Sequence, residues 1–226
     1  MSNKKKFILG GLALSTLIIF IIWAVLVSNG VTQALDDAIV EAVVNFRGEK
    51  GGFWYWLTRI TTEFGDKLII IGSILVCLIV FRVDLKSLSM GLGAGSVHLI
   101  NSAVKKIVNR ERPLEIYHWM SESSKSFPSG HTINSTFLYG FIAYLILTSN
   151  LKNKIKYPLA GAFIFVIPWV GFTRIVLSVH YFSDVIGGML FGSFILISII
   201  LIYETLKSKG IDGFRPLIDK KLKKSN

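Results

Sequence analysis

The stretch that decides the fold class is FILGGLALSTLIIFIIWAVLV, residues 7–27. These 21 residues carry no charged side chain, and an α-helix needs about 20 apolar residues to cross the hydrocarbon core of a bilayer. Lys4, Lys5 and Lys6 precede the stretch, as in the charged start of a signal peptide, but no small-x-small cleavage site follows it. We therefore interpret residues 7–27 as a transmembrane helix.

Five further apolar runs follow, each long enough or nearly long enough for a span: residues 67–81, 88–104, 132–148, 157–172 and 185–203. The second span is short unless it recruits part of residues 53–64. The pattern predicts an all-α fold, a six-transmembrane-helix bundle, in one membrane domain over residues 1–206. A short basic tail over residues 207–226 completes the chain.

The composition agrees with a membrane protein. The chain has 226 residues, of which 52% are hydrophobic, and combines a net charge of +11 with a mean hydropathy of +0.58. A water-soluble globule of this size would not normally show that combination. Cys77 is the single cysteine, so no intramolecular disulfide forms. The four histidines are scattered and no C-x-x-C or H-E-x-x-H spacing occurs, so we expect no metal and no cofactor.

The basic residues predict the orientation. With both termini in the cytoplasm, the inner side holds 15 Lys and Arg against four acidic residues, so the whole net charge of +11 lies on that side. The positive-inside tendency predicts this arrangement. These charges lie in short loops and a tail beside the membrane, where anionic lipid is the expected contact. No nucleic-acid partner is needed to explain the basic pI.

A surface helix is predicted between the first two spans. Apolar residues recur there at helical spacing, with acidic residues on the other side: Leu35, Ala38, Ile39, Ala42, Val43 and Phe46 against Asp36, Asp37 and Glu41. The aromatic cluster of residues 53–56 follows, as in an interfacial belt. We interpret this outer-surface region as a membrane anchor in preference to a substrate-recognition element.

Three short segments carry phosphate-binding and proton-transfer groups. They are KKIVNRERP at residues 105–113, PSGH at 128–131 and TRIVLSVHYFSD at 173–184. The predicted topology places all three on the outer side, at the end of the third helix, the start of the fourth, and the turn between the fifth and sixth. That convergence makes them the candidate site.

The segment PSGH precedes a predicted helix. Free backbone N–H groups at the positive end of a helix dipole form an anion site, and Gly130 lets a phosphate approach the backbone closely. His131 is expected in the first turn, pointing into that site. A plain helix cap by Ser129 explains the segment nearly as well.

The third segment pairs His180 with Asp184. If residues 180–184 are helical, this spacing puts both side chains on one face, so that Asp184 accepts the Nδ1 proton and leaves Nε2 unprotonated. An imidazole oriented in this way can attack phosphorus. The alternative is a structural ion pair near the membrane surface.

Basic side chains complete the candidate site. Guanidinium groups match phosphate oxygens bidentately, and positive charges on the outer side run against the positive-inside tendency, which points to a local function. Arg112, Arg174 and Lys105 are the residues concerned. Lys106 and Arg110 are interpreted as ordinary rim charges. Glu111, Glu115 and Glu122 receive no catalytic role.

Together these segments resemble the pattern Lys-x6-Arg-Pro, Pro-Ser-Gly-His and Ser-Arg-x5-His-x3-Asp of the type-2 phosphatidic acid phosphatase superfamily. Thr173 stands where the family usually has serine. The resemblance implies that Lys105, Arg112, Arg174, Ser129 and the Gly130 amide bind phosphate. It also implies that His180 is a nucleophile forming a phosphohistidine, that Asp184 orients it, and that His131 protonates the leaving oxygen.

The expected function is therefore that of a multi-pass lipid phosphatase in the cell membrane, with its site on the extracytoplasmic side. The substrates weighed are undecaprenyl pyrophosphate, phosphatidylglycerophosphate, phosphatidic acid and diacylglycerol pyrophosphate, and motifs that bind phosphate do not rank them. One alternative is a transporter or flippase that binds a phosphate headgroup without cleaving it. A vanadium haloperoxidase shares the motif logic, but those relatives are soluble.

Overall fold

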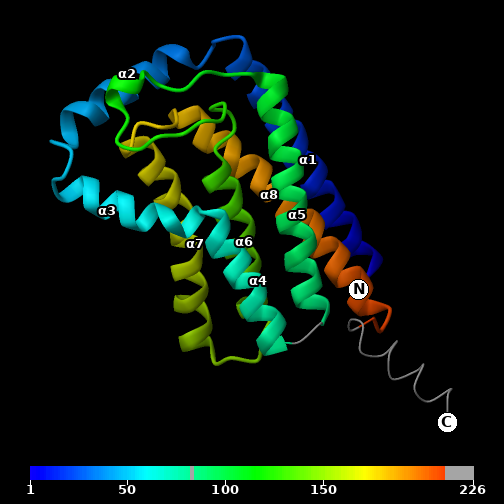
Figure 1. The fold of residues 1–226 in the computed structure, drawn as a ribbon. Coiled ribbons are helices and arrows are strands. Elements are labelled where there is room, and N and C mark those ends of the chain that lie inside the picture. Colours follow the sequence, from blue (N-terminus) through cyan, green and yellow to red (C-terminus); the bar gives the residue numbers. More distant parts are fainter. Residues whose placement is uncertain (82–83, 212–226) are drawn as a thin grey trace.

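The structure, a computed structural model, describes residues 1–81 and 84–211, and these residues form helices and no strand. The all-α prediction is confirmed. This part of the chain contains eight α-helices (Figure 1): α1 Asn3–Ser28, α2 Gln33–Phe46, α3 Phe53–Thr61, α4 Lys67–Phe81, α5 Leu85–Val108, α6 Gly130–Leu147, α7 Asn153–Val176 and α8 Phe182–Ser208. Two short 3-10 helices, η1 Thr62–Gly65 and η2 Glu115–Tyr117, lie between them. Most of the predicted tail, residues 212–226, lies outside the described residues.

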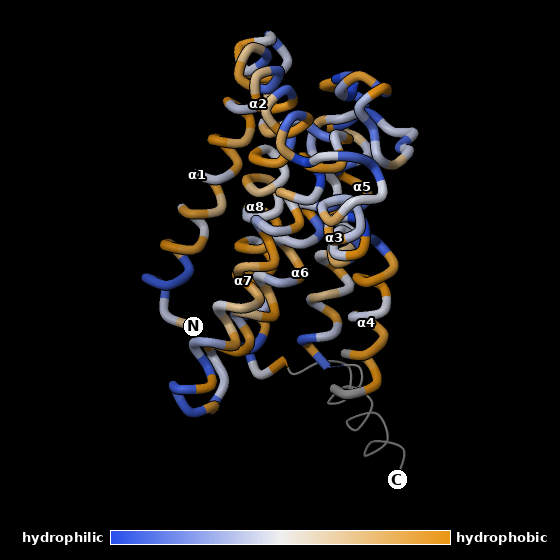
Figure 2. The backbone as a smooth tube through the Cα atoms, turned by 90° about the vertical axis from the view of Figure 1, so that its left-hand side faces the viewer, coloured by the Kyte–Doolittle hydropathy of each residue, from blue (hydrophilic) through white to orange (hydrophobic). Residues whose placement is uncertain are grey.

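Each of the six predicted spans falls in one of the helices α1, α4, α5, α6, α7 and α8. Among the described residues, three helices are long and apolar enough to cross a membrane: α1, α7 and α8. In the apolar 18-residue stretch of α1, only 11% of the residues are buried inside the protein. Figure 2 shows hydrophobic residues along most of this helix. Such a surface requires an apolar surrounding, because it has no protein covering. The six-span topology and the cytoplasmic termini stay predictions.

The region between α1 and α4 shows what the short second span does. A helix forms over α2, as predicted, and α3 is a separate helix that α4 does not recruit. The chain breaks at η1 and at Asp66, whose carboxylate accepts from the backbone N–H of Leu68 at 2.8 Å. In Figure 1, α2 and α3 lie across one end of the bundle.

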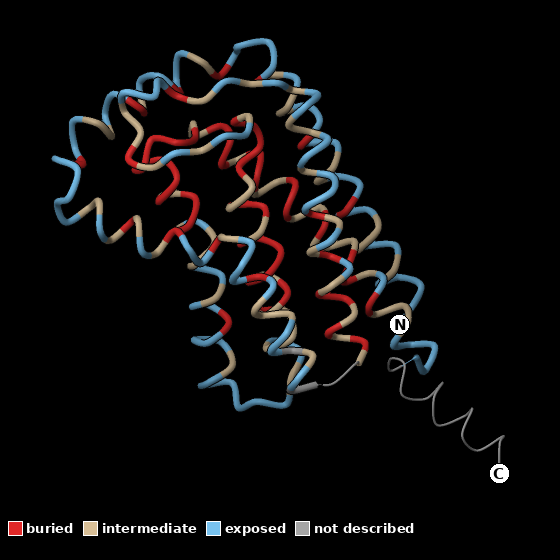
Figure 3. Tube along the Cα trace, viewed as in Figure 1, coloured by how far each residue is buried: buried red, intermediate tan, exposed pale blue. Residues whose placement is uncertain are grey.

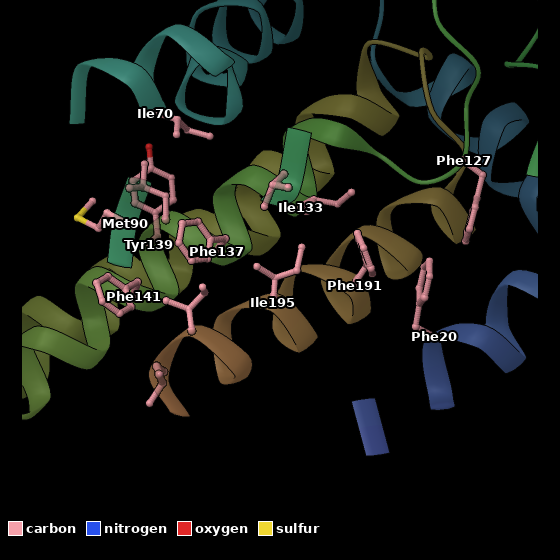
Figure 4. Packing of buried hydrophobic residues seen from close by; sticks show 14 of the residues in the cluster. Phe20, Ile70, Met90, Phe127, Ile133, Phe137, Tyr139, Phe141, Phe191 and Ile195 are labelled. Carbon is pink, nitrogen blue, oxygen red and sulfur yellow. The ribbon is translucent and has the colours of Figure 1, made fainter. Parts of the chain in front are cut away.

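The core lies around α6, which packs between α7 and α8. Figure 4 shows Phe127, Ile133, Phe137, Phe191 and Ile195 packed together there. Outside this core, most of the buried residues lie toward the end of the bundle that carries α2 and α3 (Figure 3).

Glycines on α8 allow close contact with α6. A Cβ added at Gly188 would lie 2.8 Å from Thr132 Cβ, and one added at Gly192 would lie 2.7 Å from Thr136 Cβ. Small residues at such contacts let two helix backbones approach closely. This packing holds the first turn of α8 against the start of α6, where two of the three motif segments lie.

Candidate active site

The three motif segments meet at the end of the bundle that carries α2 and α3. A backbone hydrogen bond joins the second and third segments, since Ser129 N–H donates to Asp184 O at 3.1 Å. The first segment is tied to the loop just before the second, where Ser126 N–H donates to Arg110 O at 2.9 Å. Arg112 Nη1 also lies 3.2 Å from His180 Nε2. The predicted convergence is therefore present. Figure 1 shows this end opposite to the N-terminus, and the side of the membrane on which it lies stays a prediction.

His180 lies in the turn before α8, not inside the helix. The expectation that residues 180–184 form one helical segment is wrong, because α8 begins at Phe182 with Tyr181 as its N-cap. His180 Nδ1 still lies 3.4 Å from Asp184 Oδ2, but Nδ1 makes no hydrogen bond to the described residues. The helix cap therefore brings the two groups close together, while the predicted Nδ1–H···Asp184 bond is not made in this structure.

A buried arginine supports the turn that carries His180. Ser178 has a φ of 52°, in the left-handed region that non-glycine residues occupy at a cost. Arg47, at the end of α2, donates through Nη1 to Ser178 Oγ at 2.8 Å and to Val176 O at 2.7 Å. Burial lowers the pKa of Arg47 from its usual value. These contacts fix the chain just before the nucleophile candidate.

The His180 imidazole is buried, with 2% of its surface exposed. Burial, followed by the positive charge of Arg112, lowers the pKa of His180 well below 6.5. Desolvation and neighbouring cations both disfavour an imidazolium, so the ring is neutral at pH 7. A neutral ring keeps the lone pair that a nucleophile needs.

The Asp184 carboxylate is held from several directions. Oδ1 accepts from Arg110 Nη1 at 2.9 Å, while Oδ2 accepts from Ser126 Oγ at 2.5 Å and from the Tyr181 backbone N–H at 2.9 Å. The residue is fully buried in the first turn of α8, where the helix dipole favours a negative charge. Its orientation is thereby fixed.

The three predicted phosphate-binding cations all contact one loop segment, residues 122–126, which we call the strap. Arg112 Nε donates to Ser124 O at 2.7 Å, and Lys105 Nζ donates to Ser126 O at 3.3 Å and to Lys125 O. Arg174, fully buried, forms an ion pair with Glu122. The cations therefore gather beside His180.

Glu122 was assigned no catalytic role, and its structural position was not foreseen. Its carboxylate bonds Arg174 and lies 3.6 Å from Arg112 Nη2. Arg174 Nη1 also donates to Thr62 Oγ1 at 3.0 Å, which joins η1 to the site. Nothing in the spacing of Glu122 within its loop indicates these contacts.

The start of α6 carries the second motif. His131 lies in the first turn, as predicted, with Nε2 4.0 Å from Asp66 Oδ2. Ser129 is the N-cap residue, but its side chain makes no capping bond; its Oγ accepts from Thr132 Oγ1 at 2.9 Å. A Cβ added at Gly130 would lie 3.1 Å from Asn101 Nδ2, so the backbone there is closely approached.

In the third motif, the Thr173 hydroxyl donates to Val170 O at 2.7 Å within α7.

Arg110 lies in the interior of the site, not at its rim. The interpretation as a rim charge is wrong, because only 10% of its side chain is exposed and it forms ion pairs with Asp36 and Asp184. Lys106, one turn earlier on α5, is exposed as expected. The acidic face of α2 carries Asp36, the partner of Arg110. On an amphipathic surface helix, such a face is expected to point to solvent, so the pattern does not predict this contact.

The three motifs at this site fall within one known protein family. A family model described as PAP2 superfamily matches residues 86–208, which contain all three motifs. The chain belongs to the PAP2 superfamily. This places it among lipid phosphatases and confirms the family resemblance.

Two characterised phosphatases are similar in sequence to this PAP2 protein. Phosphatidylglycerophosphatase B of Bacillus subtilis is 30% identical over 188 residues, covering 79% of this chain and 88% of the relative. Lipid A 1-phosphatase of Rhizobium etli is 29% identical over 114 residues, covering 46% of this chain and 45% of the relative.

Solved structures share the PAP2 fold. A crystal structure of a transmembrane PAP2-type phosphatidylglycerolphosphate phosphatase from Bacillus subtilis superposes with a TM-score of 0.76 at 27% identity, covering 86% of this chain and 97% of that one. Aquifex aeolicus LpxE superposes with a TM-score of 0.56 at 21% identity, covering 74% and 94%, and shows the fold alone. The transmembrane neighbour and the apolar helices both indicate that this chain is a membrane protein.

No cluster of three or more His, Cys, Asp or Glu suited to a metal ion occurs within residues 1–81 and 84–211. The metal independence of this PAP2 protein stays a prediction from the sequence.

Proposed function

We propose that this protein hydrolyses the phosphate monoester or pyrophosphate of a membrane lipid through a phosphohistidine at the outer membrane face. The observation that carries the proposal is the buried, neutral His180, which lies between Asp184 and Arg112. Binding a phosphate requires positive charge, whereas an oriented neutral imidazole serves nucleophilic attack. This feature favours hydrolysis over the transport of a phosphorylated lipid.

In the first step, His180 Nε2 attacks phosphorus and the bond to the lipid oxygen breaks. Asp184 stabilises the positive charge that develops on the ring, and Arg112, Arg174 and Lys105 stabilise the charge on the phosphoryl oxygens. The leaving oxygen takes a proton from His131. Water then gives a proton to the now neutral His131 and attacks the phosphohistidine, which releases inorganic phosphate and restores both histidines.

The role of His131 depends on the bound phosphate. Burial and then the three site cations lower the pKa of His131, which disfavours the protonated form that an acid must have. A phosphate dianion against the same cations would oppose this shift, and Asp66 lies on the other side of the ring. We propose that substrate binding protonates His131.

Phosphatidylglycerophosphate is the first substrate to test, because the 30% identical relative is a phosphatidylglycerophosphatase by name. Undecaprenyl pyrophosphate, phosphatidic acid and diacylglycerol pyrophosphate remain in the comparison. The discriminating contacts would be made to the glycerol and the lipid tail, which the phosphate motifs do not describe.

The test is phosphate release by the full chain, purified in detergent with EDTA, from each of the four lipids. His180→Ala is expected to lower the rate at least about 1,000-fold, because it removes the nucleophile. His98→Ala is the matched control, since His98 is exposed on α5 and is expected to leave the rate unchanged. Acid-labile phosphate trapped on the wild-type protein, and absent from His180→Ala, would identify the phosphohistidine.

Two outcomes would contradict the proposal. Phosphate release by folded His180→Ala would remove the nucleophile assignment. No release from any of the four lipids by a folded wild-type protein would favour the binding or transport function.

A further inference from the structure

Arg110 follows the end of α5. Asn109, the C-cap, has a φ of 49° and turns the chain out of the helix. The Arg110 carbonyl then accepts from the Ser126 N–H at 2.9 Å, which ties this point of the chain to the strap. The Arg110 side chain runs into the protein interior, toward the first turn of α8.

Both terminal nitrogens of Arg110 are engaged in that interior. Nη1 donates to Asp184 Oδ1 at 2.9 Å and to Ser183 Oγ at 2.6 Å. Nη2 donates to Asp36 Oδ2 at 2.7 Å and to Gln33 Oε1 at 3.0 Å. Its Cζ lies 4.2 Å from the centroid of the Tyr181 ring. A planar guanidinium suits such bidentate bridging, whereas a lysine supplies a point charge only.

The charge of Arg110 is matched inside the protein. Burial alone would lower its pKa, but Asp184 and then Asp36 outweigh burial, so the pKa of Arg110 is raised. A buried pair of this kind is favourable only when its remaining hydrogen bonds are satisfied, and those of Arg110 are made to Ser183 and Gln33.

Asp36 brings α2 into the same network. It is fully buried, and its Oδ1 accepts from the Ser183 backbone N–H at 3.0 Å while Oδ2 accepts from Ser183 Oγ at 2.5 Å. The N–H groups of a first helical turn have no partner within the helix, so a carboxylate there both caps the helix and fixes its start. The surface helix α2 is thereby joined to the turn that carries Asp184.

We propose that Arg110 and Asp36 are positioning residues for phosphoryl transfer. Arg110 holds Oδ1 of Asp184, which keeps Oδ2 beside Nδ1 of His180, and Asp36 holds Arg110 in place. The inference rests on the proposed function, because it assigns a purpose to the orientation of His180. It gives α2 a role in the chemistry beyond that of a membrane anchor.

The proposal separates two kinetic effects. Loss of Arg110 removes the hydrogen bond to Asp184 Oδ1 and leaves the carboxylate held through Oδ2 alone, so its orientation loosens and attack by His180 slows. The side chains of Lys105, Arg112 and Arg174 are held by their own bonds to the strap, so substrate binding is expected to change little. A residue that acts through the nucleophile therefore changes kcat and leaves KM nearly constant.

The experiment measures kcat and KM of the full chain in detergent on the lipid that the wild type hydrolyses fastest. Arg110→Gln is expected to lower kcat roughly 10-fold to 100-fold, the size typical for a residue that orients a reacting group, with KM within about threefold. Arg110→Lys is expected to recover part of that loss, because it restores the charge beside Asp184. Lys106→Gln, an exposed neighbour, is the matched control.

Asp36→Asn tests the second member and guards against misfolding of Arg110→Gln. It keeps an acceptor for Ser183 and leaves Arg110 paired with Asp184, so kcat is expected to fall several-fold with KM unchanged. The rate at which acid-labile phosphate accumulates on the protein should fall in the same order as kcat. The melting temperature in detergent reports folding for each variant.

Wild-type kcat in folded Arg110→Gln, or in both Arg110→Lys and Asp36→Asn when Arg110→Gln does not fold, overturns the proposal. A raised KM with an unchanged kcat also overturns it and places Arg110 among the phosphate-binding residues. An inactive wild type overturns the proposed function together with this inference, whereas an active wild type with inactive His180→Ala and unaffected Arg110 variants overturns this inference alone.

Discussion

Arg110 and Arg112 lie two residues apart, yet their surroundings shift their pKa values in opposite directions. Asp184 and Asp36 outweigh burial at Arg110 and raise its pKa, whereas burial outweighs Glu122 and Asp184 at Arg112 and lowers its pKa. Arg112 bonds chiefly to neutral groups, namely Ser124 and the Val179 carbonyl. The charge of Arg110 is therefore satisfied by the protein, whereas that of Arg112 retains capacity for an anion.

This contrast assigns the two sides of His180 to different tasks. On the Asp184 side, the carboxylates of Asp184 and Asp36 accept from Arg110 and from backbone N–H groups at the start of α8, in a closed network. On the strap side, three cations share carbonyls, a hydroxyl and the single carboxylate of Glu122. Phosphate oxygens can replace such acceptors, so we assign binding to the strap side and orientation to the Asp184 side.

After His180→Ala, the largest expected effect comes from Arg112→Ala. We expect kcat/KM to fall roughly 100-fold to 1,000-fold, with a raised KM, because a charge that stabilises the phosphoryl oxygens is lost. Steady-state kinetics on the preferred lipid, run beside Arg110→Gln, provide the measurement. An Arg112 variant with a normal KM would break the division between binding and orientation.

His131→Ala is expected to have an effect that depends on the leaving group. Hydrolysis of an alkyl phosphate should slow about 100-fold, because the departing alkoxide needs a proton, whereas p-nitrophenyl phosphate should slow much less. Comparing kcat for the two substrates checks the assignment. An equal loss on both would argue against an acid role for His131.

Glu122→Gln should sharpen the description of the strap side. If Glu122 competes with phosphate for Arg174 and Arg112, its neutral analogue should let orthovanadate inhibit at a concentration roughly threefold to tenfold lower. Glu111→Gln is the control, because Glu111 is 81% exposed and pairs with Lys125. Weaker inhibition in Glu122→Gln would instead show that Glu122 holds the arginines ready for phosphate.

The smallest expected effect concerns pH. Burial and then Arg112 lower the pKa of His180, so the neutral nucleophile should persist below pH 6.5, and the acid limb of kcat/KM should lie there. Removing one of those positive charges with Arg112→Gln should raise this pKa and move the limb to higher pH. The residual activity of the variant, measured from pH 4 to 8, tests the sign, and a limb moved to lower pH would contradict the assignment.

The helical fold and most of the candidate site can be predicted from sequence patterns alone. Apolar run length predicts helices because a span must satisfy its backbone internally, and the six runs do fall in helices. Spacing within each motif located His180, Asp184, Arg112 and Arg174, because residues close in the chain stay close in space.

The side chains that complete the site come together only through tertiary packing. Arg110 and Asp36 are 74 residues apart, as are Arg110 and Asp184, and Arg174 and Glu122 are 52 apart. Local spacing does not encode such pairs, which depend on how α2 and the strap pack against the first turn of α8. The same packing placed His180 before α8 and made the acidic face of α2 a buried partner of the site. A charged residue on an amphipathic helix looks solvent-facing until the element that covers it is known.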